Sequence, residues 1–186
     1  MRVVELVFVS GWGAFWLYWL ATALWAKRGH ISWAHQLRIR ILMISMVAAL
    51  LLLFRVGVFP QRYIGNTSWW LVGFGSAFFA LGLALAVWAR VHIGRNWGNP
   101  MTQKDDPELV TSGPYRLLRH PIYSGLLMAG AGTAMALSWL WLIAVVFAGT
   151  YFLYSAAVEE HYLVERFPDS YPAYRRSTKM FLPFLF

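Results

Sequence analysis

The stretch LVTSGPYRLLRHPIYSG, residues 109–125, is the most informative part of this chain. It contains three basic or titratable side chains, Arg116, Arg119 and His120, together with two tyrosines and two prolines. Most of the chain around this central stretch is apolar. Because polar side chains beside lipid are energetically costly, such a cluster marks a candidate functional site.

The composition is that of an integral membrane protein. Apolar residues make up 59% of the 186 residues and charged residues only 13%, whereas soluble domains contain about 45–50% apolar residues. There is no cysteine, which excludes disulfides and thiolate chemistry. The net charge of +8 comes from short basic clusters beside apolar runs, which is typical of a cytoplasmic membrane face. We therefore do not expect the protein to bind nucleic acid.

Five apolar runs approach the length of about 20 residues that a membrane helix needs. The expected spans are residues 3–26, 39–59, 69–92, 120–137 and 140–158, of which the fourth is short. The first run is interpreted as a retained span because it ends in Lys27-Arg28 and lacks a small-residue cleavage site. The fold class is therefore all-α, with about five transmembrane helices.

The length of the chain predicts one transmembrane domain, residues 1–186. Within it we expect three N-terminal spans in residues 1–92 and a C-terminal core in residues 93–186 that contains a helical hairpin. Three glycines in the third span, Gly73, Gly75 and Gly82, are expected to allow close approach of a neighbouring helix.

The basic residues are unevenly distributed between the loops. The loop after the second span holds Arg62 alone, whereas the intervals after the first and third spans and the tail hold four basic residues each. The positive-inside rule then places the N-terminus outside and the C-terminus in the cytoplasm. The central stretch and the pair Glu159-Glu160 would both face the cytoplasm and flank the helical hairpin. We therefore expect a cofactor pocket on the cytoplasmic side of the inner membrane.

The two adjacent carboxylates, Glu159 and Glu160, point about 100° apart on a helix. One can face the hairpin while the other reaches the surface or a neighbouring arginine. Taken alone, each cluster is also compatible with simple contacts to water or lipid headgroups. Together, the arginines, histidine, aromatic rings and carboxylates suit a zwitterionic cofactor with a flat ring and a cationic centre. No carboxylate–histidine spacing favours a metal site.

The pattern GPYRLLRHPIYSG, followed one hairpin later by EEHYL, resembles the membrane methyltransferases of the isoprenylcysteine carboxyl methyltransferase and phospholipid methyltransferase superfamily. The resemblance covers residues 94–186. It implies S-adenosylmethionine as the cofactor, bound on the cytoplasmic side. It also implies methyl transfer to a lipophilic acceptor from the bilayer, either isoprenylcysteine-like or another small thiol, amine or carboxylate.

The resemblance also implies most of the site residues, and the roles of the arginines are our own hypothesis. We expect Glu159 to lie at the junction of cofactor and acceptor, and Arg116 or Arg119 to pair with the methionine carboxylate; the expected catalytic residues are Glu159 and Arg119. The expected cofactor-binding residues are Pro107, Glu108, Leu109, Val110, Tyr115, Arg116, His120, Pro121, Ile122, Tyr123 and Glu160. Ser155 stands where the enzymes that methylate prenylated cysteine have an arginine, which puts a carboxylate acceptor in question.

Two other function classes stay open. Certain membrane sterol reductases share a similar GxYxxxRHPxY block and bind a nicotinamide cofactor, but they are larger. The acidic residues Asp105, Asp106 and Glu108 also suit the phosphates of that cofactor poorly. The other class is a non-catalytic membrane protein that binds lipid headgroups, which predicts no saturable nucleotide binding.

Overall fold

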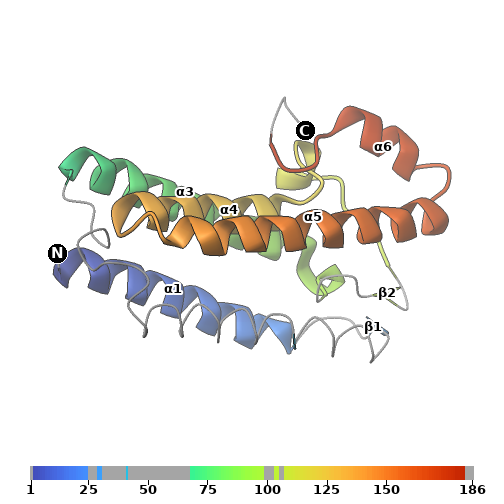
Figure 1. The fold of residues 1–186 in the computed structure, drawn as a ribbon. Helices are drawn as coiled ribbons and strands as arrows, with labels where there is room; N and C mark the ends of the chain where they lie inside the picture. Colours follow the sequence, from blue (N-terminus) through green and yellow to red (C-terminus); the bar gives the residue numbers. More distant parts are fainter. Residues whose placement is uncertain are drawn as a thin grey trace.

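The computed structural model describes residues 2–24, 29–30, 41, 68–98, 103–104 and 107–182. The elements in chain order are α1 (Arg2–Ala23), β1 (Gly29–His30), α3 (Trp69–Ile93), the 3₁₀ turn η2 (Gly94–Asn96), β2 (Gln103–Lys104), the 3₁₀ turn η3 (Gly113–Arg116), α4 (Pro121–Ala136), α5 (Trp141–Arg166) and α6 (Tyr171–Ser177). The long helices α1, α3, α4 and α5 lie roughly along one direction, and α6 lies beside the C-terminal end of α5 (Figure 1). The two short strands pair antiparallel, with Gly29 opposite Lys104.

Three of the described helices, α1, α3 and α5, are long and apolar enough to cross a membrane. Helix α4 has 16 residues, which corresponds to about 24 Å and is less than the roughly 30 Å hydrocarbon core. It begins at Pro121, whose missing N–H is tolerated in a first helical turn. The predicted fourth span thus forms a helix and is short, as expected. The predicted second span, residues 39–59, lies outside the described residues apart from residue 41.

Helices α3 and α4 approach each other closely because glycines leave space between their backbones. A Cβ at Gly75 would lie 2.6 Å from the carbonyl oxygen of Gly132, and one at Gly82 would lie 2.6 Å from that of Gly125. The prediction of close approach is therefore confirmed for these two glycines. It is wrong for Gly73, where an added Cβ would meet nothing within 4 Å among the described residues.

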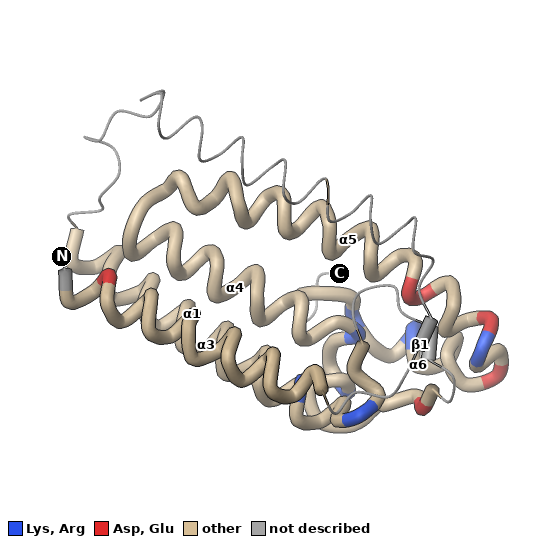
Figure 2. The backbone as a smooth tube through the Cα atoms, turned by 90° about the horizontal axis from the view of Figure 1, so that it is seen from below, with Lys and Arg blue, Asp and Glu red and all other residues tan. Residues whose placement is uncertain are grey.

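Most of the charged residues of the described elements lie at the end of the bundle opposite to the start of α1 (Figure 2). At this polar end the C-terminal segment, residues 178–182, pairs with the central stretch. Leu118 and Lys179 form a parallel bridge, and the amides of Arg119 and His120 donate to the carbonyls of Lys179 at 2.7 Å and of Met180 at 3.1 Å. The C-terminal segment therefore fixes the backbone from which Arg119 and His120 project.

Candidate active site

A cavity of about 960 Å³ lies between α1, α4 and α5 and extends to the polar end of the bundle. Along α5 its lining runs from Trp141 to Arg166, and the part from Trp141 to Glu159 corresponds to about 27 Å of helix axis. Most of the lining between these two residues is apolar or aromatic. The volume lies in the range of about 300–1,000 Å³ typical of ligand pockets. A cavity with one polar end and a long apolar wall suits a polar ligand that meets a hydrocarbon tail.

Most of the predicted site residues line this cavity. They are Pro107, Glu108, Leu109, Val110, Tyr115, Arg119, His120, Ile122, Tyr123 and Glu159. The other three do not: Arg116 is exposed, Pro121 is buried at the start of α4, and Glu160 is buried in an ion-pair network. The structure therefore brings together residues that lie up to 52 positions apart, from Pro107 to Glu159.

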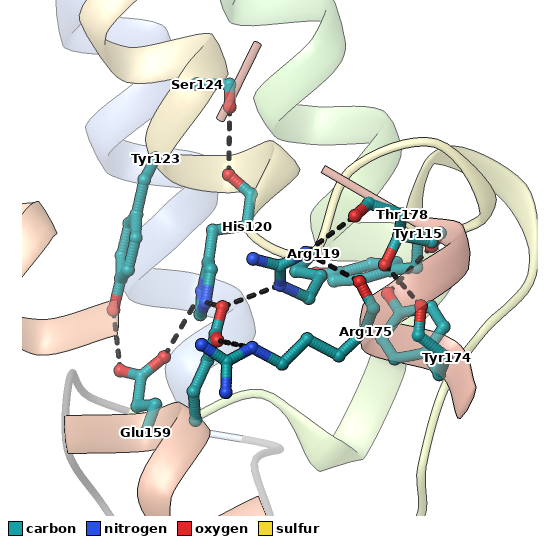
Figure 3. A network of polar contacts seen from close by, with 10 residues as sticks. Tyr115, Arg119, His120, Tyr123, Ser124, Glu159, Tyr174, Arg175 and Thr178 are labelled. Carbon is teal, nitrogen blue, oxygen red and sulfur yellow. Dashed lines mark hydrogen bonds and ion pairs between the residues drawn. The ribbon is translucent and has the colours of Figure 1, made fainter. Parts of the chain in front are cut away.

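Glu159 lies where the polar end of the cavity meets the apolar wall. The hydroxyl of Tyr123 donates to Glu159 Oε1 at 2.7 Å, and His120 Nδ1 lies 3.6 Å from Oε2. Figure 3 shows both side chains directed at this carboxylate from α4 and the residue before it. The Glu159 side chain keeps 25% of its surface exposed. The carboxylate is thus held by α4 and still accessible to a ligand in the cavity.

Three stacked rings hold the groups that contact Glu159. The rings of His120 and Tyr123 lie 5.4 Å apart at an interplanar angle of 4°, and those of Tyr123 and Phe152 lie 4.5 Å apart at 3°. Stacked aromatic pairs contribute about 0.5–1.5 kcal/mol each beyond their buried area. The stacking therefore orients the imidazole and the phenol hydroxyl toward the carboxylate.

Glu160 has different surroundings from Glu159. Its side chain is 5% exposed and accepts from Arg119 Nε at 2.6 Å, while Arg175 Nε from α6 lies 3.2 Å away. Arg119 Nη1 also donates to the carbonyls of Thr178 at 2.6 Å and of Arg175 at 3.2 Å (Figure 3). One carboxylate thus faces the cavity and the other pairs with arginines, as the 100° separation predicts. Arg119 joins α5 to α6 and the C-terminal segment.

Two tyrosines connect α6 to the cavity lining. The hydroxyl of Tyr174 donates to the carbonyl of Tyr115 at 2.7 Å, and Tyr115 is buried in the lining. Burial raises the pKa of Tyr115 far above its usual value of 10, and burial raises the pKa of Tyr174 to about 12. Both phenols are therefore protonated at neutral pH, and the Tyr174 hydroxyl can serve as a donor.

Part of the cavity lining was missed by the sequence analysis. Trp12, Trp16 and Trp19 of α1 line the cavity, as do Asn96 and Trp97 after α3. The three tryptophans of α1 are spaced by four and three positions, which places them on one helix face. That spacing was the available signal. Asn96 Nδ2 also donates to Glu108 Oε2 at 3.2 Å, which links this turn to the predicted cofactor-binding segment 107–110.

Comparisons with known proteins agree with this architecture. The family model for phospholipid methyltransferase matches residues 70–170. The chain is 32% identical over 122 residues to protein-S-isoprenylcysteine O-methyltransferase B of Arabidopsis thaliana, covering 63% of this chain and 61% of the relative. It is 30% identical over 132 residues to the cobalt-zinc-cadmium resistance protein CzcN of Cupriavidus metallidurans, covering 68% and 58%.

A solved structure has a similar fold. The eukaryotic intramembrane Ras methyltransferase, an isoprenylcysteine carboxyl methyltransferase, superposes with a TM-score of 0.62 at 26% identity, covering 78% of this chain and 53% of that one. The apolar helices and this likeness define an integral membrane protein with an all-helical fold. The chain belongs to the phospholipid methyltransferase family, within the superfamily that the central stretch resembles. It spans about 60% of the length of the curated relatives that it matches.

Proposed function

We propose that this protein transfers a methyl group from S-adenosylmethionine to a lipophilic acceptor in the membrane. The position of Glu159 carries the proposal, because this carboxylate stands at the junction of a polar pocket and a 27 Å long apolar wall (about 18 residues of helix). Membership of the phospholipid methyltransferase family supports it, as do the relatives named as isoprenylcysteine O-methyltransferases. By the distribution of basic residues, the polar end of the bundle faces the cytoplasm.

The residues at the polar end fit this cofactor. The carboxylates of Glu108 and Glu159 suit its ammonium group, and the rings of Tyr115 and Trp97 suit a flat base or a cationic sulfur. When bound, the cofactor supplies a methyl group activated by its sulfonium. Arg119 has its Nε and Nη1 engaged by Glu160 and the C-terminal segment. In this proposal Arg119 therefore holds the site in shape, in addition to any contact it makes with the cofactor.

Positioning supplies most of the catalysis, because methyl transfer from a sulfonium is an in-line displacement that needs little covalent help. Glu159 orients the head of the acceptor and accepts its proton when that head is an amine, thiol or hydroxyl. The Tyr123 hydroxyl keeps the carboxylate in place through its 2.7 Å hydrogen bond. The wall formed by α1, α4 and α5 holds the hydrocarbon tail and keeps water away from the reacting groups.

The observations support a chemical class for the hydrocarbon tail of the acceptor more strongly than for its polar head group. The isoprenylcysteine relatives point to a prenyl-like tail, and the apolar wall suits one. Ser155 lies one helical turn before Glu159, is fully buried and brings no positive charge to a carboxylate head. We therefore propose a prenyl-like or comparably lipophilic acceptor, and we leave the choice between a carboxylate, thiol or amine head to experiment.

Methyl transfer can be measured on the purified chain in lipid vesicles with radiolabelled S-adenosylmethionine. Farnesyl compounds that differ only in their carboxylate, thiol or amine head compare the acceptor chemistries, and the same heads without a tail serve as controls. We expect transfer to at least one farnesyl compound and little transfer to the short ones. Absence of transfer to every compound and to the vesicle lipids contradicts the proposal.

A matched pair of variants tests the role of Glu159. Glu159→Gln should lower turnover by about 100-fold or more, whereas Glu5→Gln, which changes an exposed carboxylate in the first turn of α1, should leave it unchanged. Full turnover of Glu159→Gln with the best acceptor refutes the assignment.

A further inference from the structure

Arg90 is a buried cation near the end of α3 that the proposed reaction does not use. It is only 4% exposed, and it lies in a helix that is long and apolar enough to cross a membrane. Burying a charge is costly unless it is hydrogen-bonded. A charged residue in such a position is therefore a candidate for a specific role, with the partners named.

The partners of Arg90 are the carbonyl ends of two helices. Its Nη1 donates to the carbonyl of Gly94 and its Nη2 to the carbonyl of Thr22, both at 2.7 Å. Helix α1 ends at Ala23 and α3 ends at Ile93. Carbonyls at helix C-termini lack partners within the helix and carry partial negative charge. One guanidinium thus joins the last turn of α1 to Gly94, the C-cap residue of α3, whose carbonyl also accepts from the amide of Trp97 at 3.3 Å.

The same guanidinium contacts two tryptophans. Its central carbon lies 4.5 Å from the ring centroid of Trp97 and 5.9 Å from that of Trp19. The two indoles meet edge to face, with centroids 5.4 Å apart and an interplanar angle of 85°. Both indoles line the cavity, and Arg90 itself is not among the lining residues. Arg90 can therefore act on a ligand through these rings.

The wall that contains Trp97 lies beside the segment 107–110. The neighbouring Asn96 donates to Glu108 at 3.2 Å, and Trp97 and Val110 pack on the same buried cluster, which includes Tyr115. Helix α1, which supplies Trp19, lies outside the region 70–170 that matches the family model. The contacts of Arg90 thus connect a helix outside the matched region to the polar end of the cavity.

We propose that Arg90 is a positioning residue that fixes Trp97 and Trp19 as the wall of the cavity beside the bound cofactor. This proposal rests on the proposed methyltransferase function. Without Arg90, the end of α1 separates from the turn after α3, and the two indoles lose the cation that holds them. The consequence is weaker binding of the cofactor with little change in the rate of the chemical step, because Arg90 acts on the wall of the cavity whereas the proposed reaction takes place at Glu159.

Two variants of Arg90 separate its charge from its shape. Arg90→Met keeps an unbranched side chain and removes the guanidinium. Arg90→Lys keeps the charge but lacks the planar guanidinium whose two NH₂ groups donate to the two carbonyls. Calorimetry with S-adenosylhomocysteine should show Kd raised about tenfold in Arg90→Met and by a smaller factor in Arg90→Lys. The KM for S-adenosylmethionine should rise with Kd, and kcat should stay within about twofold of the wild type.

A double-mutant cycle tests whether Arg90 acts through Trp97. Trp97→Leu should raise Kd by about as much as Arg90→Met, and the double variant should lose little more, because contacting residues are not additive. Trp88→Leu is the matched control: it removes an exposed indole of α3, and the variant should bind as the wild type does. Additive losses, or an unchanged Kd in Arg90→Met, overturn the proposal.

If Arg90→Met does not fold, Arg90→Lys takes its place in the cycle. In that case Trp97→Leu alone must raise Kd about tenfold, and an unchanged Kd contradicts the proposal. Failure of the wild-type protein to bind S-adenosylhomocysteine refutes the proposed function itself. Binding by the wild type with no effect of these substitutions refutes only the role of Arg90.

Discussion

Replacing Glu160 with glutamine removes the negative charge at the centre of the ion-pair network. Glu160 and Arg119 are 5% and 10% exposed and their atoms Oε1 and Nε lie 2.6 Å apart, so the variant leaves Arg119 buried without its counter-charge. Breaking a buried pair in this way costs about 3–5 kcal/mol. Arg175 contacts the same carboxylate at 3.2 Å but is 56% exposed. Exposed pairs contribute only about 0.2–1 kcal/mol.

These magnitudes predict very different thermal shifts for the two partners. In a chain of this size, 1 kcal/mol moves the midpoint of unfolding by about 2–4 °C. Glu160→Gln should therefore lower Tm by roughly 6–20 °C, and Arg175→Gln by at most about 4 °C. Both can be measured by circular dichroism on protein purified in one detergent, so that the surrounding medium is the same for every variant.

Two outcomes refute this reasoning. Equal shifts for Glu160→Gln and Arg175→Gln show that burial does not control the strength of the pairs. A wild-type Tm for Glu160→Gln shows that the pair with Arg119 does not stabilise the fold. The combined variant Arg119→Gln/Glu160→Gln provides the control: it should recover part of the lost stability, because no unpaired charge stays buried.

Two further predictions concern packing and a single hydrogen bond. Gly82→Val should lower Tm clearly, because its side chain would meet the backbone of Ala129 and the Gly125 carbonyl. Gly73→Val should not, because a Cβ at Gly73 meets nothing within 4 Å among the described residues. Thermal melting of both variants compares them directly. Tyr174→Phe should cost about 1 kcal/mol at neutral pH through loss of its hydrogen bond to Tyr115. Because the folded-state pKa of Tyr174 is raised to about 12, its stabilising contribution is complete below pH 10, the pKa of the unfolded state, and is lost as the pH rises through 12. Denaturation measured between pH 8 and 12 should therefore show a smaller loss of stability with pH in the variant; equal slopes contradict the assignment.

The positions of the helices followed from the sequence because hydropathy and capping act locally. The predicted span 69–92 and the observed Trp69–Ile93 differ by one residue. The start of α4 at Pro121 follows from the absence of a proline N–H. Helix α5 continues to Arg166, eight residues beyond the predicted span, because hydropathy marks the end of an apolar run and not the end of a helix. The predicted orientation in the membrane stays a prediction.

The site was harder to predict because its contacts are long-range. The central stretch and Glu159 could be recognised as motifs, and the structure places both at one cavity. The pairing of the C-terminal segment with Leu118 and Arg119 joins residues about 60 positions apart, and no local pattern signals it. Arg90 likewise reaches Thr22 across 68 positions. In the sequence, Arg90 looks like an ordinary basic residue near the end of a span.

The central claim is that the polar end of the cavity binds a methyl donor. Calorimetry of the purified protein with S-adenosylmethionine, S-adenosylhomocysteine and NADPH tests it most directly, with Tyr123→Phe as a variant that loosens the Glu159 carboxylate. The proposed function predicts saturable binding of the first two ligands, weaker binding in the variant and no binding of NADPH. Saturable binding of NADPH without binding of either adenosyl compound, or no saturable binding of any of the three, contradicts it.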